Sequence, residues 1–292
     1  MNKNKKPVGA LADLKSKVEI GKFMGGYFAN PKNCEVFWDI GIKPILENLS
    51  DKLKYVDFGG GEGVLAEVID KFLKKSGKSI LTTVADINEN YLKKAGEKGL
   101  HTELCNIETC KLKNLDLATA RAVLHYNTED RQPLIIKKIY DSLKGGGYFV
   151  HQVSSGSAVN VRLRSAIVNL PSLGRVGKEQ YYRWTTIDET LALHNAAGFS
   201  SSVVAGYAPP SKWGTMDQWE RMHTAETREA ENKNNFELLA KIKKQKEKYL
   251  AEANSLTEQY LTAFGPEQTG IEKLADGLYT LHYTYPVIVS RK

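Results

Sequence analysis

The strongest constraint on the fold is the glycine-rich segment 56–63, which reads Val-Asp-Phe-Gly-Gly-Gly-Glu-Gly. A short apolar run ends at Val56, and apolar residues at helical spacing follow from Val64 to Phe72. This order predicts a strand, a loop and a helix. Glycines allow positive φ and a close approach of a ligand to the backbone, and a helix begins with unpaired N–H groups. The segment therefore predicts a ligand-binding turn in an α/β protein.

The spacing of the glycines separates two kinds of ligand site. A dinucleotide-binding turn has the pattern G-x-G-x-x-G, which needs a third glycine at a position that is Val64 here. The alternate glycines Gly59, Gly61 and Gly63 after Asp57 instead resemble the first motif of the class I S-adenosylmethionine (SAM)-dependent methyltransferases. An NAD enzyme is therefore disfavoured, and another α/β protein with a glycine-rich turn is the alternative to weigh against the rest of the chain.

Later segments resemble the remaining strands of that family, in the same order. The segments that suit strands two to seven are 79–86, 101–105, 116–127 (which includes the turn after strand four), 143–150, 201–206 and 279–289. One departure is Gly145, where the family usually has Pro. The resemblance covers roughly residues 50 to 206 and the final strand. It implies an α/β, Rossmann-like fold whose seven-stranded sheet is mostly parallel, with the last strand antiparallel.

The chain divides into four parts by its pattern. We expect an N-terminal helical segment over 1–50, the SAM-binding core over 51–206, a helical insertion between strands six and seven over 207–277, and the final strand over 278–292. The glycine- and aromatic-rich stretch 23–31 either folds over the cofactor or packs the first helices onto the sheet. The insertion is too long for an unstructured loop and its apolar residues keep near-helical spacing. Such insertions commonly roof the substrate pocket in this family.

The resemblance also implies which residues hold SAM. Asp86 would accept hydrogen bonds from the ribose hydroxyls, although it also suits the cap of a helix starting at Asn88. Asn106 stands where the family usually has an Asp that contacts the adenine amino group, and its amide oxygen can accept the same bond. The expected cofactor-binding residues are Asp57, Gly59, Gly61, Gly63, Asp86, Ile87, Asn106, Ile107 and His125.

Methyl transfer from SAM is an in-line displacement in which the cofactor brings the electrophile. The protein then supplies position, a dry pocket and in some cases a base, and a histidine suits a hydroxyl acceptor. His125, just past strand four, and His223, in the insertion, are the catalytic candidates. Each also fits a packing role, and we interpret His151, His194 and His282 as structural.

Aromatic and charged residues outside the core are candidates for binding the acceptor. Arg183 could hold a carboxylate or a phosphate. The segment 181–184 also suits an aromatic lead-in to the helix that the sequence Thr-Thr-Ile-Asp-Glu begins at 185. The expected substrate-binding residues are Tyr27, Tyr182, Arg183, Trp219 and His223.

Charge and composition limit the partners. The formal charge is +7, but the lysine run between 241 and 248 lies on an amphipathic helical pattern, so we interpret it as a solvated face and expect no nucleic acid. The three cysteines lack zinc spacing and suit reduced thiols, and we expect no metal. With no run of 18 apolar residues and no secretory signal, we expect a cytoplasmic protein without a membrane partner; a homodimer is left open.

These patterns favour a SAM-dependent methyltransferase acting on an O, N or C atom of a small-molecule metabolite or natural product. Two alternatives stay open. One is a methyltransferase for RNA or protein, for which the basic charge argues. The other is a catalytically silent protein of the same fold that serves as a scaffold.

Overall fold

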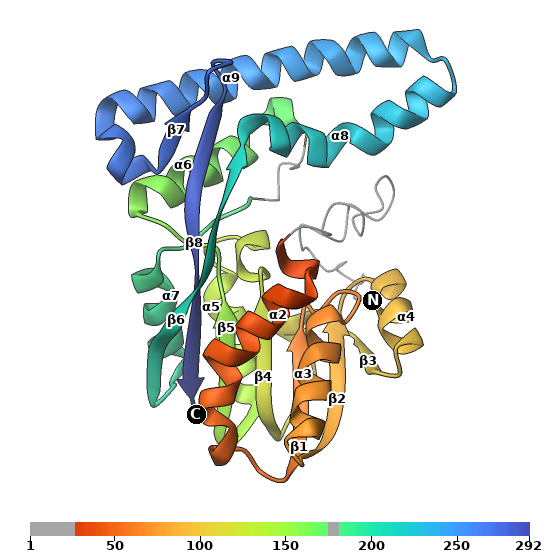
Figure 1. Cartoon of the computed structure of the whole chain (residues 1–292), viewed down its shortest axis with the longest axis vertical. Coiled ribbons are helices and arrows are strands. Elements are labelled where there is room, and N and C mark those ends of the chain that lie inside the picture. The colour runs from red at the N-terminus through yellow and green to blue at the C-terminus, as the bar shows by residue number, and fades with distance from the viewer. Residues whose placement is uncertain (1–26, 175–180) are drawn as a thin grey trace, which may run out of the picture.

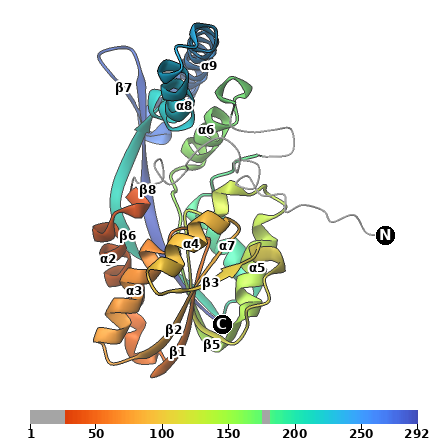
Figure 2. The ribbon, with the colours of Figure 1, turned by 90° about the vertical axis from the view of Figure 1, so that its right-hand side faces the viewer.

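An α/β sheet with helices on both faces forms the body of the protein (Figures 1 and 2). The computed structural model describes residues 27–174 and 181–292. The helical pattern predicted around residues 11–20 and most of the stretch 23–31 lie outside the described residues.

The sheet has the strand order β3-β2-β1-β4-β5-β8-β6, and the short strand β7 pairs with β8. Strands β1 to β5 pair in parallel, whereas β8 is antiparallel to both β5 and β6. The mostly parallel sheet with an antiparallel last strand is therefore confirmed. The described residues add one strand, β7, to the seven predicted. The strands are β1 Lys52–Phe58, β2 Ser79–Asp86, β3 His101–Leu104, β4 Leu115–Arg121, β5 Leu143–Gln152, β6 Ser201–Gly214, β7 Ile271–Lys273 and β8 Tyr279–Arg291.

Helices cover the two faces of the sheet unequally. On one face, α2, α3 and α4 and the turn η3 enclose a core with β1, β4 and β5, and on the other face α5 and α7 enclose a second core (Figure 2). The predicted start of α7 is confirmed, because Thr186 and Glu189 form a reciprocal capping box. The helices and helical turns of this body are η2 Tyr27–Ala29, α2 Pro31–Phe37, η3 Trp38–Ile42, η4 Lys43–Asn48, α3 Val64–Lys75, α4 Glu89–Glu97, η5 Ile107–Thr109, η6 Leu124–Tyr126, α5 Gln132–Ser142 and α7 Ile187–Ala197.

Strand six does not stop at residue 206, where the sequence predicted its end. β6 continues to Gly214 beside β8, with bulges between Val204 and Gly206 and between Ala208 and Ser211. β6 is the edge strand of the sheet. The prolines at 209 and 210, which lack a backbone N–H, therefore remove no hydrogen bond between central strands. The helical part of the insertion consequently begins at 215 rather than at 207.

The insertion is a pair of helices that sits on the far ends of β6 and β8 (Figure 1). It consists of α8 Thr215–Asn232 and α9 Phe236–Thr269, and α9 is interrupted where Gly265 leaves the helical conformation. Both pack on α6 Ala158–Val168 and η7 Pro171–Leu173 to form a third core. The predicted helical insertion is thus present. Within the described residues, none of the helices has the length and apolar character needed to cross a membrane.

Candidate functional site

A cleft opens where the carboxyl ends of β1, β2 and β4 meet. It has two lobes, which share Gly59, Gly61, Tyr91, Arg121 and Ala122. The first lobe, about 730 Å³, is further lined by residues of the second and third strand ends, among them Asp86, Ile87, Asn106 and Ile107. The second lobe, about 650 Å³, is further lined by Phe28, Asp57, Gly60, Glu62, Val64 and Leu65. In an open α/β sheet this edge is where ligands bind.

The three alternate glycines have different tasks. All have positive φ, at 65° for Gly59, 56° for Gly61 and 75° for Gly63. A Cβ on Gly61 would have Tyr91 Cδ2 as its nearest neighbour, at 4.0 Å, so this glycine leaves the floor of the cleft open. A Cβ on Gly63 would lie 2.8 Å from a methyl of Leu100. Gly63 lines neither lobe and instead permits close packing at the start of α3.

Asp86 is held rigidly at the end of β2. Its Oδ2 accepts a hydrogen bond from Gly61 N at 3.0 Å, and its Oδ1 accepts one from Asn88 N at 2.9 Å. Burial raises the pKa of Asp86, and these two bonds oppose the rise. A carboxylate has about four lone-pair positions, so Asp86 keeps acceptor capacity for a ligand. It accepts from the amide of Asn88, but the side-chain cap of α4 comes from Asn88 itself.

Asp57 lies beneath the second lobe, in a buried chain of hydroxyl groups. Thr119 Oγ1 donates to Asp57 Oδ1 at 2.7 Å, and Tyr55 donates to Thr119 at 2.8 Å. Burial raises the pKa of Asp57 to about 7, although the Thr119 bond and the charge of Arg121 lower it. A carboxyl group with a pKa near neutral pH ionises readily beside a positive charge, so Asp57 favours a cationic group in the lobe.

Asn106 and Ile107, both predicted to bind the cofactor, line the first lobe. Asn106 Oδ1 accepts a hydrogen bond from Glu108 N at 3.1 Å and so caps η5. A second lone pair and the NH₂ group of its amide can serve a ligand. Ile107 is buried, and with Ile87, Val123 and Ile135 it gives the lobe an apolar wall. This combination suits a flat ring with a polar edge.

The two catalytic candidates do not lie at the cleft. His125 lines neither lobe; its ring stacks on Trp184 with centroids 5.0 Å apart, and its carbonyl accepts from Arg183 N. His223 lies in α8, where its Nε2 is 2.8 Å from the Leu173 carbonyl and its ring stacks on Trp219 at 3.8 Å. Both positions suit packing. A proton-transfer role for either stays a prediction without support from this geometry.

The substrate candidates separate into two groups. Trp219 is buried in the third core with Tyr249, and Tyr182 is buried in the same core. Tyr27, by contrast, stacks on Tyr285 of β8 with centroids 3.9 Å apart, beside Phe28 of the second lobe. None of the five lines either lobe; Tyr27 contacts the lining residue Phe28, and Tyr182 contacts the lining residue Tyr126.

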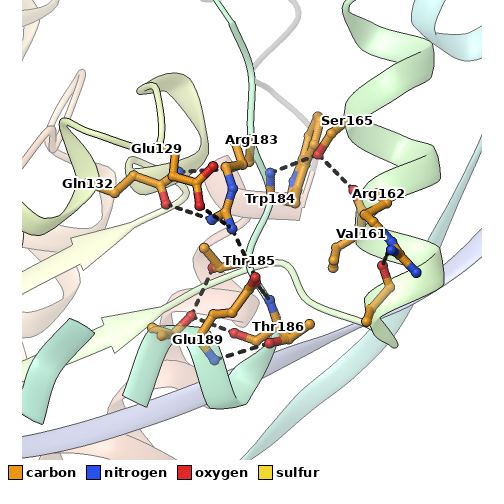
Figure 3. A network of polar contacts seen from close by, with 12 residues as sticks. Glu129, Gln132, Val161, Arg162, Ser165, Arg183, Trp184, Thr185, Thr186 and Glu189 are labelled. Carbon is orange, nitrogen blue, oxygen red and sulfur yellow. Dashed lines mark hydrogen bonds and ion pairs between the residues drawn. The ribbon is translucent and has the colours of Figure 1, made fainter. Parts of the chain in front are cut away.

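Arg183 is fully engaged by the protein (Figure 3). Its Nη2 lies 2.9 Å from Glu189 and 3.3 Å from Glu129, and its Nη1 donates to Gln132 at 3.3 Å. Two carboxylates already balance its charge. The prediction that it holds an anionic acceptor is therefore not favoured, and Arg183 instead fastens the segment before α7 to α5.

The sequence reasoning missed Arg121, Tyr91 and Ala122, which line both lobes. Arg121 is 8% exposed, donates to the Phe28 carbonyl at 3.1 Å and keeps its Nε without a partner among the described residues. A basic residue at the carboxyl end of a strand that is otherwise buried was the available signal. Ala122 has φ 54°, which no sequence pattern indicates.

Among the described residues, no three His, Cys, Asp or Glu side chains gather as a metal site would require. The cysteines Cys34, Cys105 and Cys110 are free thiols.

No protein-family model and no curated protein matches the sequence. Solved structures do match. One is a protein of Bacillus halodurans provisionally assigned as a methyltransferase, with a TM-score of 0.62 and 14% identity over 89% of this chain and 99% of that one. Another is YcgJ of Bacillus subtilis, with a TM-score of 0.57 and 15% identity over 85% and 96%.

The chain has the class I methyltransferase fold. At these identities the likeness is one of fold. In a methyltransferase fold with this strand order, the cleft of Gly61 and Asp86 lies at the switch point between β1 and β4, where the topology places a ligand.

Proposed function

We propose that the protein is an enzyme that binds SAM in the two-lobed cleft and transfers its methyl group to an O, N or C atom of a small molecule. The observation that carries the proposal is the pairing of Gly61 with Asp86. The hydrogen bond from Gly61 N to Asp86 Oδ2 holds both residues at the same edge of the sheet, with open space beside Gly61. A ligand with vicinal hydroxyls, an aromatic base and a zwitterionic tail matches the groups on either side.

The residues present fit SAM part by part. Asp86 would accept from the ribose hydroxyls, and Asn106 and Ile107 would hold the adenine in the first lobe. In the second lobe, Asp57 would balance the ammonium of the amino-acid tail, and the unpartnered Nε of Arg121 would donate to its carboxylate. Bound SAM supplies an electrophilic methyl group. The chain supplies orientation and a site from which water is excluded.

A small acceptor is supported by the aromatic side chains around the second lobe. Tyr27 stacks on Tyr285, and Phe28 packs edge-to-face against both beside Arg121, so these rings can offer an apolar wall to a compact molecule. The lysines 241, 243, 244 and 248 are solvent-exposed on α9, as expected for a solvated helix face. A cytoplasmic location remains a prediction from the sequence.

Isothermal calorimetry with SAM, S-adenosylhomocysteine and NAD tests the proposal. Wild-type protein should bind the first two in the micromolar range, about −8 kcal/mol, and should not bind NAD. Asp86→Ala should lose at least about ten-fold in affinity because the ribose loses its acceptors. Asp39→Ala, at an exposed position paired with Lys43, is the control and should bind normally.

Failure of both SAM ligands to bind would overturn the assignment. A salt-dependent electrophoretic shift with total RNA would favour the macromolecular alternative. Binding of SAM without turnover over a broad acceptor panel would favour the silent scaffold.

A further inference from the structure

Arg164 of α6 carries a buried positive charge, and no carboxylate of the described residues forms an ion pair with it. The residue is 1% exposed, and its Nη2 donates to Ser154 Oγ at 2.5 Å. Its Nε and Nη1, which hold three of the five N–H donors of the guanidinium, have no hydrogen-bond partner among the described residues. Such a group is rare unless it is paired.

Aromatic rings enclose this guanidinium but do not neutralise it. Its Cζ lies 4.1 Å from the ring centre of Tyr283 and 4.8 Å from that of Trp184. These cation–π contacts orient the side chain and leave its edge N–H groups free. Burial lowers the pKa of Arg164 to about 10, so it remains charged at neutral pH.

Two further buried side chains have polar atoms without a hydrogen-bond partner among the described residues. Both amide atoms of Gln152, a fully buried residue at the end of β5, have no partner among the described residues, and neither does the Tyr27 hydroxyl. Gln152 is paired with Arg121 of β4 on one side and with Val287 of β8 on the other. Paired residues share a face, as do residues two apart on one strand.

Arg121, Gln152 and Tyr285 therefore lie on the same face of three adjacent strands. Tyr27 stacks on Tyr285, and the Tyr285 hydroxyl donates to Tyr283, which packs against Arg164. Arg121, Gln152 and Tyr285 thus share one face of the sheet, and the contacts of Tyr27, Tyr285 and Tyr283 connect this face to Arg164. Arg121 is assigned to the carboxylate of SAM, and the groups between it and Arg164 are neutral, so this arrangement suits a small molecule with a polar middle and an anionic end.

We propose that the acceptor carries a carboxylate and that Arg164 binds it, while Gln152 and Tyr27 form hydrogen bonds with the rest of the molecule. This inference rests on the proposed function. A carboxylate is favoured over a phosphate because Arg121 is assigned to the SAM carboxylate, which leaves the single charge of Arg164 for the acceptor, and the tyrosines are neutral: burial raises the pKa of Tyr27 to about 12 and that of Tyr285 further. One negative charge balances Arg164, whereas a phosphate dianion would bring a second, unpaired charge into a buried place.

The test uses the full chain saturated with S-adenosylhomocysteine and three probes of one shape: benzoate, the neutral benzamide, and phenyl phosphate. Binding is followed by calorimetry and by ligand-observed NMR. Benzoate should bind, and benzamide and phenyl phosphate should bind at least about ten-fold more weakly, because only benzoate matches the single charge.

Variants identify the group responsible. Arg164→Gln should lower the affinity for benzoate at least about ten-fold. Arg164→Lys should retain part of that affinity because it keeps the charge. Arg162→Gln is the matched control: this exposed arginine, two residues away on α6, donates to its own helix at the Ala158 carbonyl and should leave benzoate binding unchanged (Figure 3).

Equal binding of benzoate and benzamide, no binding of benzoate, or unchanged benzoate affinity in Arg164→Gln would overturn the inference. Tighter binding of phenyl phosphate than of benzoate would overturn the carboxylate and indicate an acceptor with a phosphate group. If Arg164→Gln does not fold, the wild-type probe comparison and Arg164→Lys still decide. Affinity for S-adenosylhomocysteine, measured in the same samples, reports on the proposed function separately.

Discussion

Three arginines at the carboxyl edge of the sheet show how the surroundings of a residue determine its use. Arg183 forms ion pairs with two glutamates and is a structural clamp. Arg121 is anchored by the Phe28 carbonyl and by Cys34 Sγ, and its Nε has no hydrogen-bond partner among the described residues. Arg164 has aromatic neighbours and a single hydroxyl acceptor. Among the described residues, Arg121 and Arg164 thus have buried N–H groups without a hydrogen-bond partner, whereas Arg183 is paired with carboxylates.

Gly61→Val should abolish binding of S-adenosylhomocysteine, because the new side chain would fill the open floor of the cleft at positive φ. The backbone strain should cost about 1–2 kcal/mol of unfolding free energy. Gly77→Val is the matched control: Gly77 has φ 79° and no atom within 4 Å of its would-be Cβ. Calorimetry and urea unfolding should show similar destabilisation in both variants and lost affinity only in Gly61→Val.

Arg121→Gln should weaken S-adenosylhomocysteine by roughly ten- to hundred-fold, since a charge-assisted hydrogen bond to the ligand carboxylate is lost. Methylthioadenosine lacks the amino-acid tail and should bind the variant and the wild type equally. Competition calorimetry with the two ligands makes the comparison. Equal losses for both would show that Arg121 acts by shaping the lobe rather than by binding the tail.

At the scale of elements, the helical insertion is anchored by its own core. α8 and α9 share buried side chains with α6 and with the outer halves of β6 and β8, and Trp219, His223 and Tyr249 belong to that packing. The long strands β6 and β8 extend past the other strands and carry the helix pair at their ends (Figure 1). Its role as a roof over the acceptor stays a proposal, and its stabilising role is testable.

Trp219→Ala should lower the free energy of unfolding by about 3–5 kcal/mol, as removal of a buried aromatic side chain does, and should leave affinity for S-adenosylhomocysteine unchanged. Phe236→Ala, at a position that is 76% exposed, should change stability little. Urea unfolding followed by circular dichroism measures both. A Trp219→Ala protein of wild-type stability would mean that α8 is not part of the folded core.

For the whole molecule, buried ionisable groups link stability to pH. His151 Nδ1 lies 3.0 Å from His194 Nε2 between β5 and α7, and burial lowers the pKa of His151 to about 3 and that of His194 well below its usual value. The unfolded chain binds protons at these residues near pH 6.5, whereas the folded chain does not. Stability should therefore fall as pH drops below 6.5. Asp57 acts in the opposite direction. Because its pKa is raised in the folded protein, the stability that it contributes is lost as pH rises from about 4 to 7.

His151→Gln should reduce the loss of stability on acidification by about 1.4 kcal/mol per pH unit between pH 6.5 and 5, because one proton uptake is removed. Urea unfolding at several pH values gives the slope. His101→Gln, at an exposed position on β3, serves as the control. An identical slope in wild type and His151→Gln would show that His151 does not contribute to the acid sensitivity.

Local patterns were enough to predict the glycine loop, the helix start at Thr186 and the helical insertion, because each depends on residues close in sequence. The mostly parallel sheet was predicted from the resemblance of the ordered segments to the methyltransferase family. The end of β6 was misplaced because two prolines normally end a strand, and the edge position that tolerates them is a tertiary property.

The partners of the polar side chains were decided only by the tertiary structure. Asp57 meets Thr119 across 62 residues, and Arg164 meets Tyr283 across more than a hundred. Arg183 pairs with Glu189, six residues away, and with Glu129, 54 residues away, and only the folded chain shows that both carboxylates face it. Whether a charge is balanced depends on which distant segments converge on it. The sequence by itself therefore determined the fold and most of the cleft, and the packing of distant strands and helices determined which arginine remains available to a ligand.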